Sequence, residues 1–181
     1  PHLHLSLQSG NTLILKRMKR RYTRELVYDR VAALRARIPN LVLSADVMVG
    51  FPTETDEQYQ DTVDMVRDLP VAYPHVFRYS QRSDTPAARI PKQVPGQVKK
   101  RRAAHLRSVA AQVRDSVLRS RIGHSSRILV EGGGQPPRGY HRGRAGDYLP
   151  VYVPADAAAV GQWLRVQFAA VRDATLIARP V

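Results

Sequence analysis

The chain has 181 residues, no cysteine and 43% hydrophobic residues, which is enough apolar material for a folded core. The absence of cysteine excludes disulfide bonds, thiolate metal sites and a cysteine nucleophile. No apolar run approaches the ~20 residues of a membrane span, and no signal peptide is recognisable. We therefore expect a soluble, cytoplasmic protein with no membrane partner. Because Pro1 already lies inside a predicted strand, we also expect a fragment of a longer protein.

The formal net charge of +14 is concentrated in one segment. Residues 92–127 contain ten Lys and Arg side chains against one acidic residue, whereas residues 1–91 contain 13 against ten. A local excess of this size favours a polyanionic partner, most often nucleic acid. A solvated charged surface is the alternative interpretation.

The first predicted strand alternates strictly between apolar and polar residues. Leu3, Leu5 and Leu7 fall on one side of it, and His2, His4, Ser6 and Gln8 fall on the other. In a sheet covered by helices the leucines would pack under the helices. The polar row would then suit the interior of a barrel that holds a polar ligand.

The following segments alternate between helix and strand. Thr23 is a plausible N-cap for a helix that extends to about Arg37, and Thr55 with Gln58 forms a capping-box pattern before a helix that Pro70 ends. Apolar strands are predicted at residues 41–49 and 73–80. This order predicts parallel strands joined by right-handed crossovers, either in an open sheet or in an arc of a barrel.

Asp46 is a carboxylate inside the apolar strand 41–49. It could be a hydrogen-bonded polar group at a strand end. The alternative is functional, because the junction of strand, loop and helix that begins at Gly50 is where the sites of parallel α/β proteins lie.

A proline-rich stretch at residues 81–95 predicts an extended linker, and a long helix is predicted from Gln97 to Arg121. Four cations recur every seven residues along that helix, so we expect them on one side of it, facing phosphates. They are Lys100, Arg107, Arg114 and Arg121.

The last 55 or so residues predict short strands separated by glycine-rich turns, which is typical of a small antiparallel barrel. Residues 138–144 interleave aromatic side chains, Tyr140 among them, with cations such as Arg142, and Tyr148 follows just beyond. Such a surface stacks bases and neutralises phosphate, although a glycine-arginine turn on any barrel has a similar composition.

Four segments in order resemble the radical S-adenosylmethionine methylthiotransferases. They are PHLHLSLQSG at residues 1–10, LKRMKRRYT at 15–23, DVMVGFPTET at 46–55 and FRYSQRSDTPAA at 77–88. The first and last are similar to the branch that methylthiolates threonylcarbamoyladenosine at position 37 of tRNA. The tail from about residue 125 is similar to the TRAM domain, a small RNA-binding barrel.

The resemblance implies an α/β fold: the C-terminal half of a radical SAM partial (β/α) barrel, followed by an all-β, OB-like TRAM barrel. We expect the barrel part at residues 1–91, a basic linker helix at 92–124 and the TRAM-like barrel at 125–181. The missing N-terminal half of the same enzyme and tRNA are the implied partners.

The implied cofactors are S-adenosylmethionine and two four-iron four-sulfur clusters of the complete enzyme. Since cluster ligation needs thiolates, these residues cannot hold either cluster by the family's scheme. The residues that match cofactor-contacting positions of the family are Ser6, Gln8, Ser9, Arg20, Asp46 and Gly50. Arg20 could instead be a solvated cation. Thr53 stands where the family usually has glycine, and Ser83-Asp84 replace its usual Pro-Gly.

The implied reaction cleaves S-adenosylmethionine, abstracts hydrogen from carbon 2 of the adenine and inserts a methylated sulfur. We expect no metal ligand and no catalytic side chain in this piece, and we interpret His2, His4 and His75 as structural histidines rather than acid-base groups. The alternatives are an RNA-binding module only, or a methylthiotransferase for isopentenyladenosine in tRNA or for a ribosomal protein.

Overall fold

The computed structural model describes residues 1–181, which divide into two compact units. One unit is Leu3–Val113, called here the α/β unit. The other comprises Pro1–His2 and Arg114–Val181, and is called the barrel unit. The two are described separately below.

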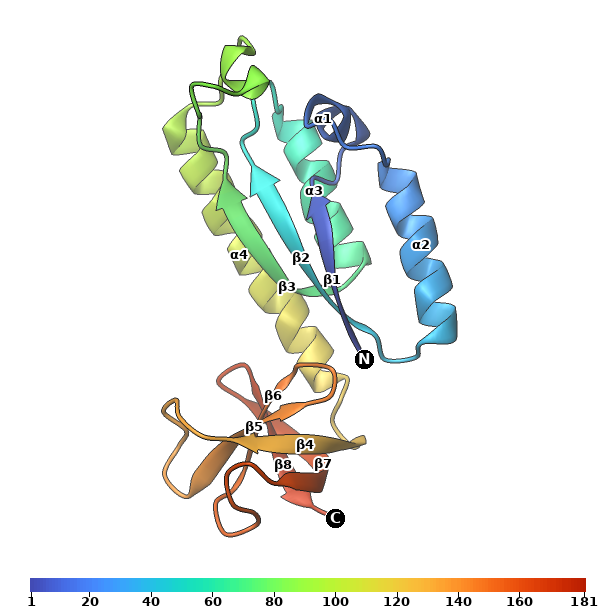
Figure 1. The fold of residues 1–181 in the computed structure, drawn as a ribbon, viewed down its shortest axis with the longest axis vertical. Helices are drawn as coiled ribbons and strands as arrows, with labels where there is room; N and C mark the ends of the chain where they lie inside the picture. The colour runs from blue at the N-terminus through green and yellow to red at the C-terminus, as the bar shows by residue number, and fades with distance from the viewer. The chain divides into compact units, whose positions relative to one another are not determined.

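The α/β unit is built on a three-stranded sheet in the order β1-β2-β3, and β2 and β3 pair in parallel (Figure 1). The predicted alternation of strand and helix is confirmed, with short helical elements in addition. The elements are β1 (His2–Gln8), α1 (Thr12–Arg17), α2 (Arg24–Arg37), β2 (Val42–Val49), α3 (Asp56–Asp68), β3 (Val71–Arg78), η1 (Pro86–Arg89) and most of α4 (Gly96–Arg119).

Side-chain caps set where the helices begin. The Thr23 hydroxyl accepts from the Leu26 N–H at the start of α2, and Thr55 and Gln58 form the predicted capping box at the start of α3. Helix α1 was not predicted. Asn11 begins it, because its side-chain oxygen accepts from two backbone N–H groups of the first turn.

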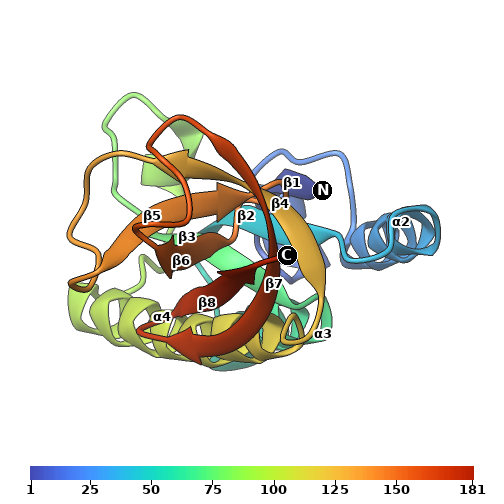
Figure 2. The same ribbon diagram turned by 90° about the horizontal axis from the view of Figure 1, so that it is seen from below.

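The two faces of the sheet differ in chemistry. Leu43, Ala45, Val47 and Val49 of β2 are buried on the face that α3 and α4 cover, as Figures 1 and 2 show. The other face carries the alternate residues, including Asp46, and it is open in this unit. The predicted polar row of β1 lies on that open face, so the alternation seen in the sequence marks the difference between the two faces.

Helix α2 is only partly buried. Val31 is fully buried, whereas Val27, Leu34 and Ile38 are only partly buried against the core. The reason is its place beside β1, the edge strand, rather than over the centre of the sheet (Figure 1).

The barrel unit is a closed five-stranded barrel in the order β4-β5-β6-β8-β7. All neighbours are antiparallel except β6 and β8, which are parallel. The strands are β4 (Ser125–Glu131), β5 (Tyr140–Ala145), β6 (Pro150–Pro154), β7 (Trp163–Arg172) and β8 (Thr175–Pro180). The predicted fold class, a partial parallel barrel followed by a small β-barrel, is therefore confirmed.

Strand β5 was not predicted from the sequence. Its cations and glycines conceal its strand character. Gly143 is needed where β5 pairs with β4, because a Cβ there would lie 3.0 Å from the Leu129 carbonyl oxygen.

Helix α4 ends at Arg119 rather than at the predicted Arg121. None of the helices combines the length and the apolar character that crossing a membrane requires.

Candidate functional site

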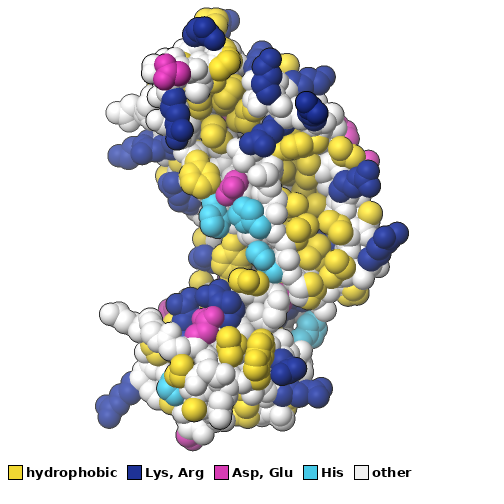
Figure 3. Space-filling view, in the orientation of Figure 1, with side chains coloured by type: hydrophobic (Ala, Val, Ile, Leu, Met, Phe, Trp, Pro, Cys, Tyr) yellow, Lys and Arg dark blue, Asp and Glu magenta, His cyan; other side chains and the backbone are white.

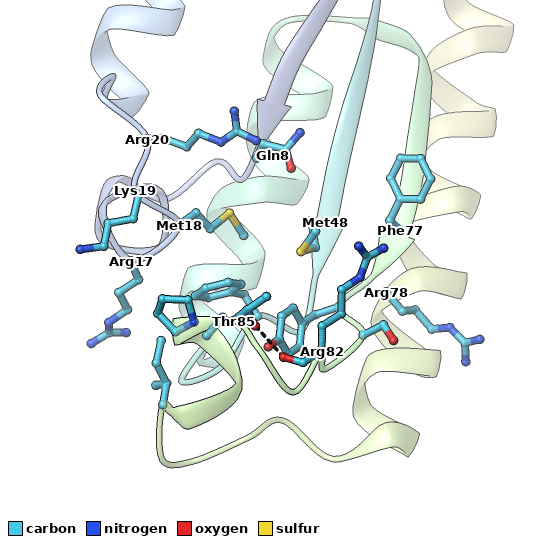
Figure 4. A pocket seen from close by; sticks show the side chains of 16 residues that line it. Gln8, Arg17, Met18, Lys19, Arg20, Met48, Phe77, Arg78, Arg82 and Thr85 are labelled. Atoms are coloured by element: carbon cyan, nitrogen blue, oxygen red, sulfur yellow. Dashed lines mark hydrogen bonds between the residues drawn. The ribbon is translucent and has the colours of Figure 1, made fainter.

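A cavity of about 700 Å³ lies at the carboxyl ends of β1, β2 and β3, and Figure 4 shows its lining. Gln8, Met48 and Phe77 contribute from the three strands. Five cations also line it, and no carboxylate does; the cations are Arg17, Lys19, Arg20, Arg78 and Arg82. This donor set suits an anionic ligand, because nothing in the lining neutralises the positive charge.

Beneath the cations the cavity has an apolar floor. Ile14, Phe51 and Tyr79 form a small buried cluster, and the Phe51 and Tyr79 rings meet edge to face with 5.3 Å between centroids. The Tyr79 hydroxyl is buried and has no hydrogen-bond partner within the chain. A flat ring with polar atoms at its edge, such as an adenine, fits against an aromatic floor of this kind.

Thr53 links two parts of this region in a strained conformation. Its φ of 72° lies in the left-handed region, which β-branched residues rarely adopt and which costs on the order of 1–3 kcal/mol. The Thr53 N–H donates to the Lys92 carbonyl oxygen at 3.0 Å, and Arg17 donates to its hydroxyl. The methylthiotransferases that this chain resembles usually have glycine at this position, and glycine would remove the strain.

Gly50 adopts φ 73°, and a Cβ there would lie 2.3 Å from Cγ of Lys99 in α4. Its N–H donates to Oε2 of Glu54 at 2.7 Å. Glycine is therefore required for the close packing of this loop against α4, rather than for contact with the cavity.

A buried ion-pair cluster fixes the same loop. Arg102 of α4 is 5% exposed and donates to Oε2 of Glu54 at 2.7 Å and to Oδ1 of Asp56 at 2.8 Å. Burial raises the pKa of the Glu54 carboxyl, opposed by the Gly50 N–H and by Arg102. The hydrogen bond from Arg102 lowers the pKa of Asp56. Sequence reasoning missed Arg102, because it stands among exposed cations of the same helix.

Tyr59 of α3 extends this cluster. Its hydroxyl donates to the Arg102 carbonyl oxygen at 2.9 Å and lies 2.7 Å from Nδ1 of His105. Burial, with the nearby charge of Glu54, raises the pKa of Tyr59 to about 12. The phenol therefore stays protonated, and it joins α3 to α4 beneath the loop.

Of the six residues predicted to contact the cofactor, Gln8 and Arg20 line the cavity. Ser6 is exposed on the open face of the sheet, whereas Ser9 is buried, with its hydroxyl 3.4 Å from that of Thr62. Gly50 faces α4. A cofactor role for Ser6, Ser9, Asp46 and Gly50 stays a prediction.

Asp46 lies within β2 rather than at its end, and its Oδ1 is 3.3 Å from Nε2 of His4. Nδ1 of the same ring is 2.8 Å from the Ser44 hydroxyl. His75, the register partner of Asp46 on β3, meets the His4 ring edge to face at 5.4 Å. The structure thus brings these four polar residues together on the open face of the sheet.

The predicted row of cations on the long helix is only partly exposed. Lys100 and Arg107 are exposed, and Arg107 donates to the Val76 carbonyl oxygen at 3.0 Å. Arg114 is half-buried. Arg121 is buried and lies 3.5 Å from Oδ2 of Asp147, so placing it in an exposed helical row was wrong; the helix ends two residues before it.

In the barrel unit the predicted aromatic residues differ in exposure. Tyr140 and Arg142 are half-buried on β5, and Tyr148 is 58% exposed with the Arg144 guanidinium 5.9 Å from its ring centre. Sequence reasoning missed a second exposed aromatic, Trp163, beneath Arg127 at 5.2 Å. The sequence signal that could have identified it is that Trp163 is the only tryptophan of the chain.

The cofactors implied by the resemblance differ in how well they fit these residues. Iron–sulfur clusters do not fit, since the chain offers no thiolate and no cluster of three or more His, Asp or Glu side chains suited to a metal ion. S-adenosylmethionine fits the cavity in part: the apolar aromatic floor and the unpartnered Tyr79 hydroxyl suit its adenine, and the cations suit its carboxylate. Its sulfonium and ammonium groups find no carboxylate in this lining.

Comparison with known proteins gives a family match for the N-terminal third of the chain. Residues 1–66 match the Radical SAM superfamily. The chain is 36% identical over 165 residues to a tRNA-2-methylthio-N(6)-dimethylallyladenosine synthase from Desulfitobacterium hafniense, covering 91% of the chain and 37% of that relative. For the protein of the same name from Acetivibrio thermocellus the identity is 35%, over 97% of the chain and 36% of the relative.

A third relative is the threonylcarbamoyladenosine tRNA methylthiotransferase MtaB of Rickettsia prowazekii, 43% identical over 131 residues, with 72% of the chain and 31% of the relative covered. The chain thus spans about a third of the length of the curated relatives it matches. Together these matches relate it to the C-terminal portion of the radical SAM methylthiotransferases, as its motifs predicted. They do not single out the threonylcarbamoyladenosine branch.

Proposed function

We propose that the chain is part of a tRNA methylthiotransferase that adds a methylthio group to carbon 2 of N6-threonylcarbamoyladenosine at tRNA position 37. The observation that carries this proposal is the cation-lined cavity at the carboxyl ends of β1, β2 and β3, whose floor is formed by aromatic side chains. Sites of parallel α/β proteins lie at this edge, and the similarity to tRNA-modifying enzymes extends over nearly the whole chain.

In this proposal S-adenosylmethionine occupies the cavity and, when bound, supplies the radical chemistry. The chain's own residues bind and orient it. Arg20 pairs with its carboxylate, the Gln8 amide hydrogen-bonds its polar atoms, and Phe51 with Tyr79 provides the surface against which its adenine packs. Cluster ligation belongs to residues outside these 181, since no cysteine is present here.

The test is the nucleoside composition of tRNA from a strain that lacks the gene encoding this chain. We expect methylthio-threonylcarbamoyladenosine to disappear and to return when the gene is restored. Loss of methylthio-dimethylallyladenosine instead would support the activity named in two of the relatives and overturn the preferred substrate. Unchanged amounts of both would reject a tRNA nucleoside as the substrate and leave the ribosomal-protein alternative.

The second candidate is a module that only binds RNA, and the exposed Trp163 and Tyr148, each beside an arginine, favour it. Measuring tRNA affinity of the chain against salt tests this function. We expect the affinity to fall as salt rises, and the slope to fall by about one for each phosphate contact removed, for example in Lys100→Gln and Arg107→Gln. A slope near zero in the unmodified chain would contradict RNA binding by these cations.

A further inference from the structure

The open face of the sheet carries a polar cluster that the cofactor cavity does not include. It consists of His4, Ser44, Asp46 and His75, one or two residues from each strand. Histidine side chains gather beside an acidic side chain on this face, as Figure 3 shows. The opposite face packs against the apolar core, so the hydrogen-bonding groups of the sheet are concentrated on this face, where His4, Asp46 and His75 are accessible to a polar ligand.

The cluster is continuous with the cavity along the strands. Asp46 and His75 each precede by two residues a residue that lines the cavity, Met48 on β2 and Phe77 on β3. Residues two apart on a strand share a face and lie about 6.6 Å apart along it. A ligand that extends from the cavity down this face therefore meets Asp46 and His75 next.

The hydrogen bonds within the cluster decide which groups remain for a ligand. Both ring nitrogens of His4 are engaged, Nδ1 with the Ser44 hydroxyl at 2.8 Å and Nε2 with Oδ1 of Asp46 at 3.3 Å. Asp46 keeps its second carboxylate oxygen, and side-chain exposure of 34% makes it accessible. His75 meets His4 only through its ring, so its nitrogens remain available. The cluster thus offers a fixed acceptor beside a group that can donate or accept.

We propose that Asp46 and His75 recognise the polar side group of the substrate nucleoside, an inference that rests on the proposed function and identifies residues that determine its specificity. A threonylcarbamoyl group carries amide N–H groups, a hydroxyl and a carboxylate. Asp46 accepts from an N–H or the hydroxyl, His75 hydrogen-bonds a carbonyl or hydroxyl oxygen, and the carboxylate pairs with a cation of the cavity rim such as Arg82.

The same residues disfavour a dimethylallyl group. That group is pure hydrocarbon, and packing it against Asp46 and His75 would remove water from a carboxylate and an imidazole without replacing their hydrogen bonds. A site built to hydrogen-bond a substrate discriminates strongly against an analogue that lacks the matching groups. The cluster therefore selects the polar nucleoside over the apolar one.

The test measures binding of the 181-residue chain to two anticodon stem-loop RNAs that differ only in the threonylcarbamoyl group on the target adenosine. We expect the unmodified chain to bind the threonylcarbamoyl RNA about tenfold more tightly, and His75→Phe to bring the ratio close to one. The phenylalanine keeps the ring and its contact with His4 but lacks the nitrogens. Asp46→Asn, which keeps the shape of the side chain, should lower the ratio as well.

The ratio of two affinities does not depend on the fraction of folded protein, so a merely structural role of His75 would not change it. His124→Phe, at an exposed histidine of the barrel unit, serves as the matched control and should keep the ratio of the unmodified chain. A ratio near one in the unmodified chain, or an undiminished ratio in His75→Phe, would overturn the inference.

The two proposals fail separately. The nucleoside profile of the deletion strain tests the proposed function and requires no property of His75. The stem-loop ratio tests recognition of the side group and requires no catalytic activity.

Discussion

Two groups of arginines in the α/β unit differ in what surrounds them. Arg102 is buried between the carboxylates of Glu54 and Asp56, and every charge of that cluster has an opposite partner. The arginines of the cavity rim, Arg20, Arg78 and Arg82, have no carboxylate beside them. The loop from Gly50 to Thr55 takes part in both regions, since Phe51 lines the cavity and Glu54 pairs with Arg102, so the two groups differ in the pairing of their charges.

This difference separates a role in stability from a role in binding. A buried ion pair stabilises the fold only while both partners are present, because removing one leaves the other charge in a poorly solvated environment. An unpaired cation at the rim of a cavity contributes little to folding and keeps its charge for a ligand. Substitutions in the two groups should therefore affect different measurements.

The largest effect is expected when Arg102 is replaced. Arg102→Met leaves the buried Glu54 carboxylate without its cation, and we expect the free energy of unfolding to fall by about 3–5 kcal/mol. Urea denaturation of the 181-residue chain measures this loss.

Arg101→Met is the matched control, since Arg101 is the preceding, exposed residue of the same helix and should change stability by no more than about 0.5 kcal/mol. Adding Glu54→Gln to Arg102→Met should restore part of the loss, because the amide removes the uncompensated charge. Equal effects of Arg101→Met and Arg102→Met would contradict the distinction between paired and unpaired arginines.

A smaller effect, on binding rather than on folding, is expected at the cavity rim. Arg20→Gln should weaken the binding of S-adenosylmethionine about tenfold, because a hydrogen bond to a charged group is lost, while stability changes by no more than about 0.5 kcal/mol. Titration calorimetry and urea denaturation of the same sample measure both quantities.

Arg21→Gln is the control for this experiment, since Arg21 is exposed and does not line the cavity. Comparable weakening in the two variants would show only a general effect of positive charge, and would argue against a specific pairing at Arg20.

The parts of the fold that the sequence predicted depend on local patterns. The alternation in residues 2–8 and the capping box of Thr55 and Gln58 need no knowledge of distant residues, and both occur as predicted. Strand β5 was missed because its pairing with β4 and β6, rather than its own composition, keeps it extended.

For the site, the sequence identified Gln8 and Arg20, which line the cavity, because each belongs to a motif. It could not distinguish Arg102 and Arg121, which are buried beside carboxylates, from their exposed neighbours. Those carboxylates are 48 and 26 positions away in the chain, from Arg102 to Glu54 and from Arg121 to Asp147. Pairing over such distances exists only in the folded chain.

The smallest effect concerns Tyr59, which donates its hydroxyl proton to the Arg102 carbonyl oxygen and so belongs to the paired region. Its pKa is raised from 10.0 to about 12, so between these pH values the folded chain keeps a proton that the unfolded chain has lost. The contribution of this group to stability is fully present below pH 10 and falls as the pH rises toward 12. Tyr59→Phe has no proton to lose, and its unfolding free energy should therefore fall less steeply over this range than that of the unmodified chain. Urea denaturation at a series of alkaline pH values measures the two slopes, and equal slopes would mean that the proton of Tyr59 is not held by the fold.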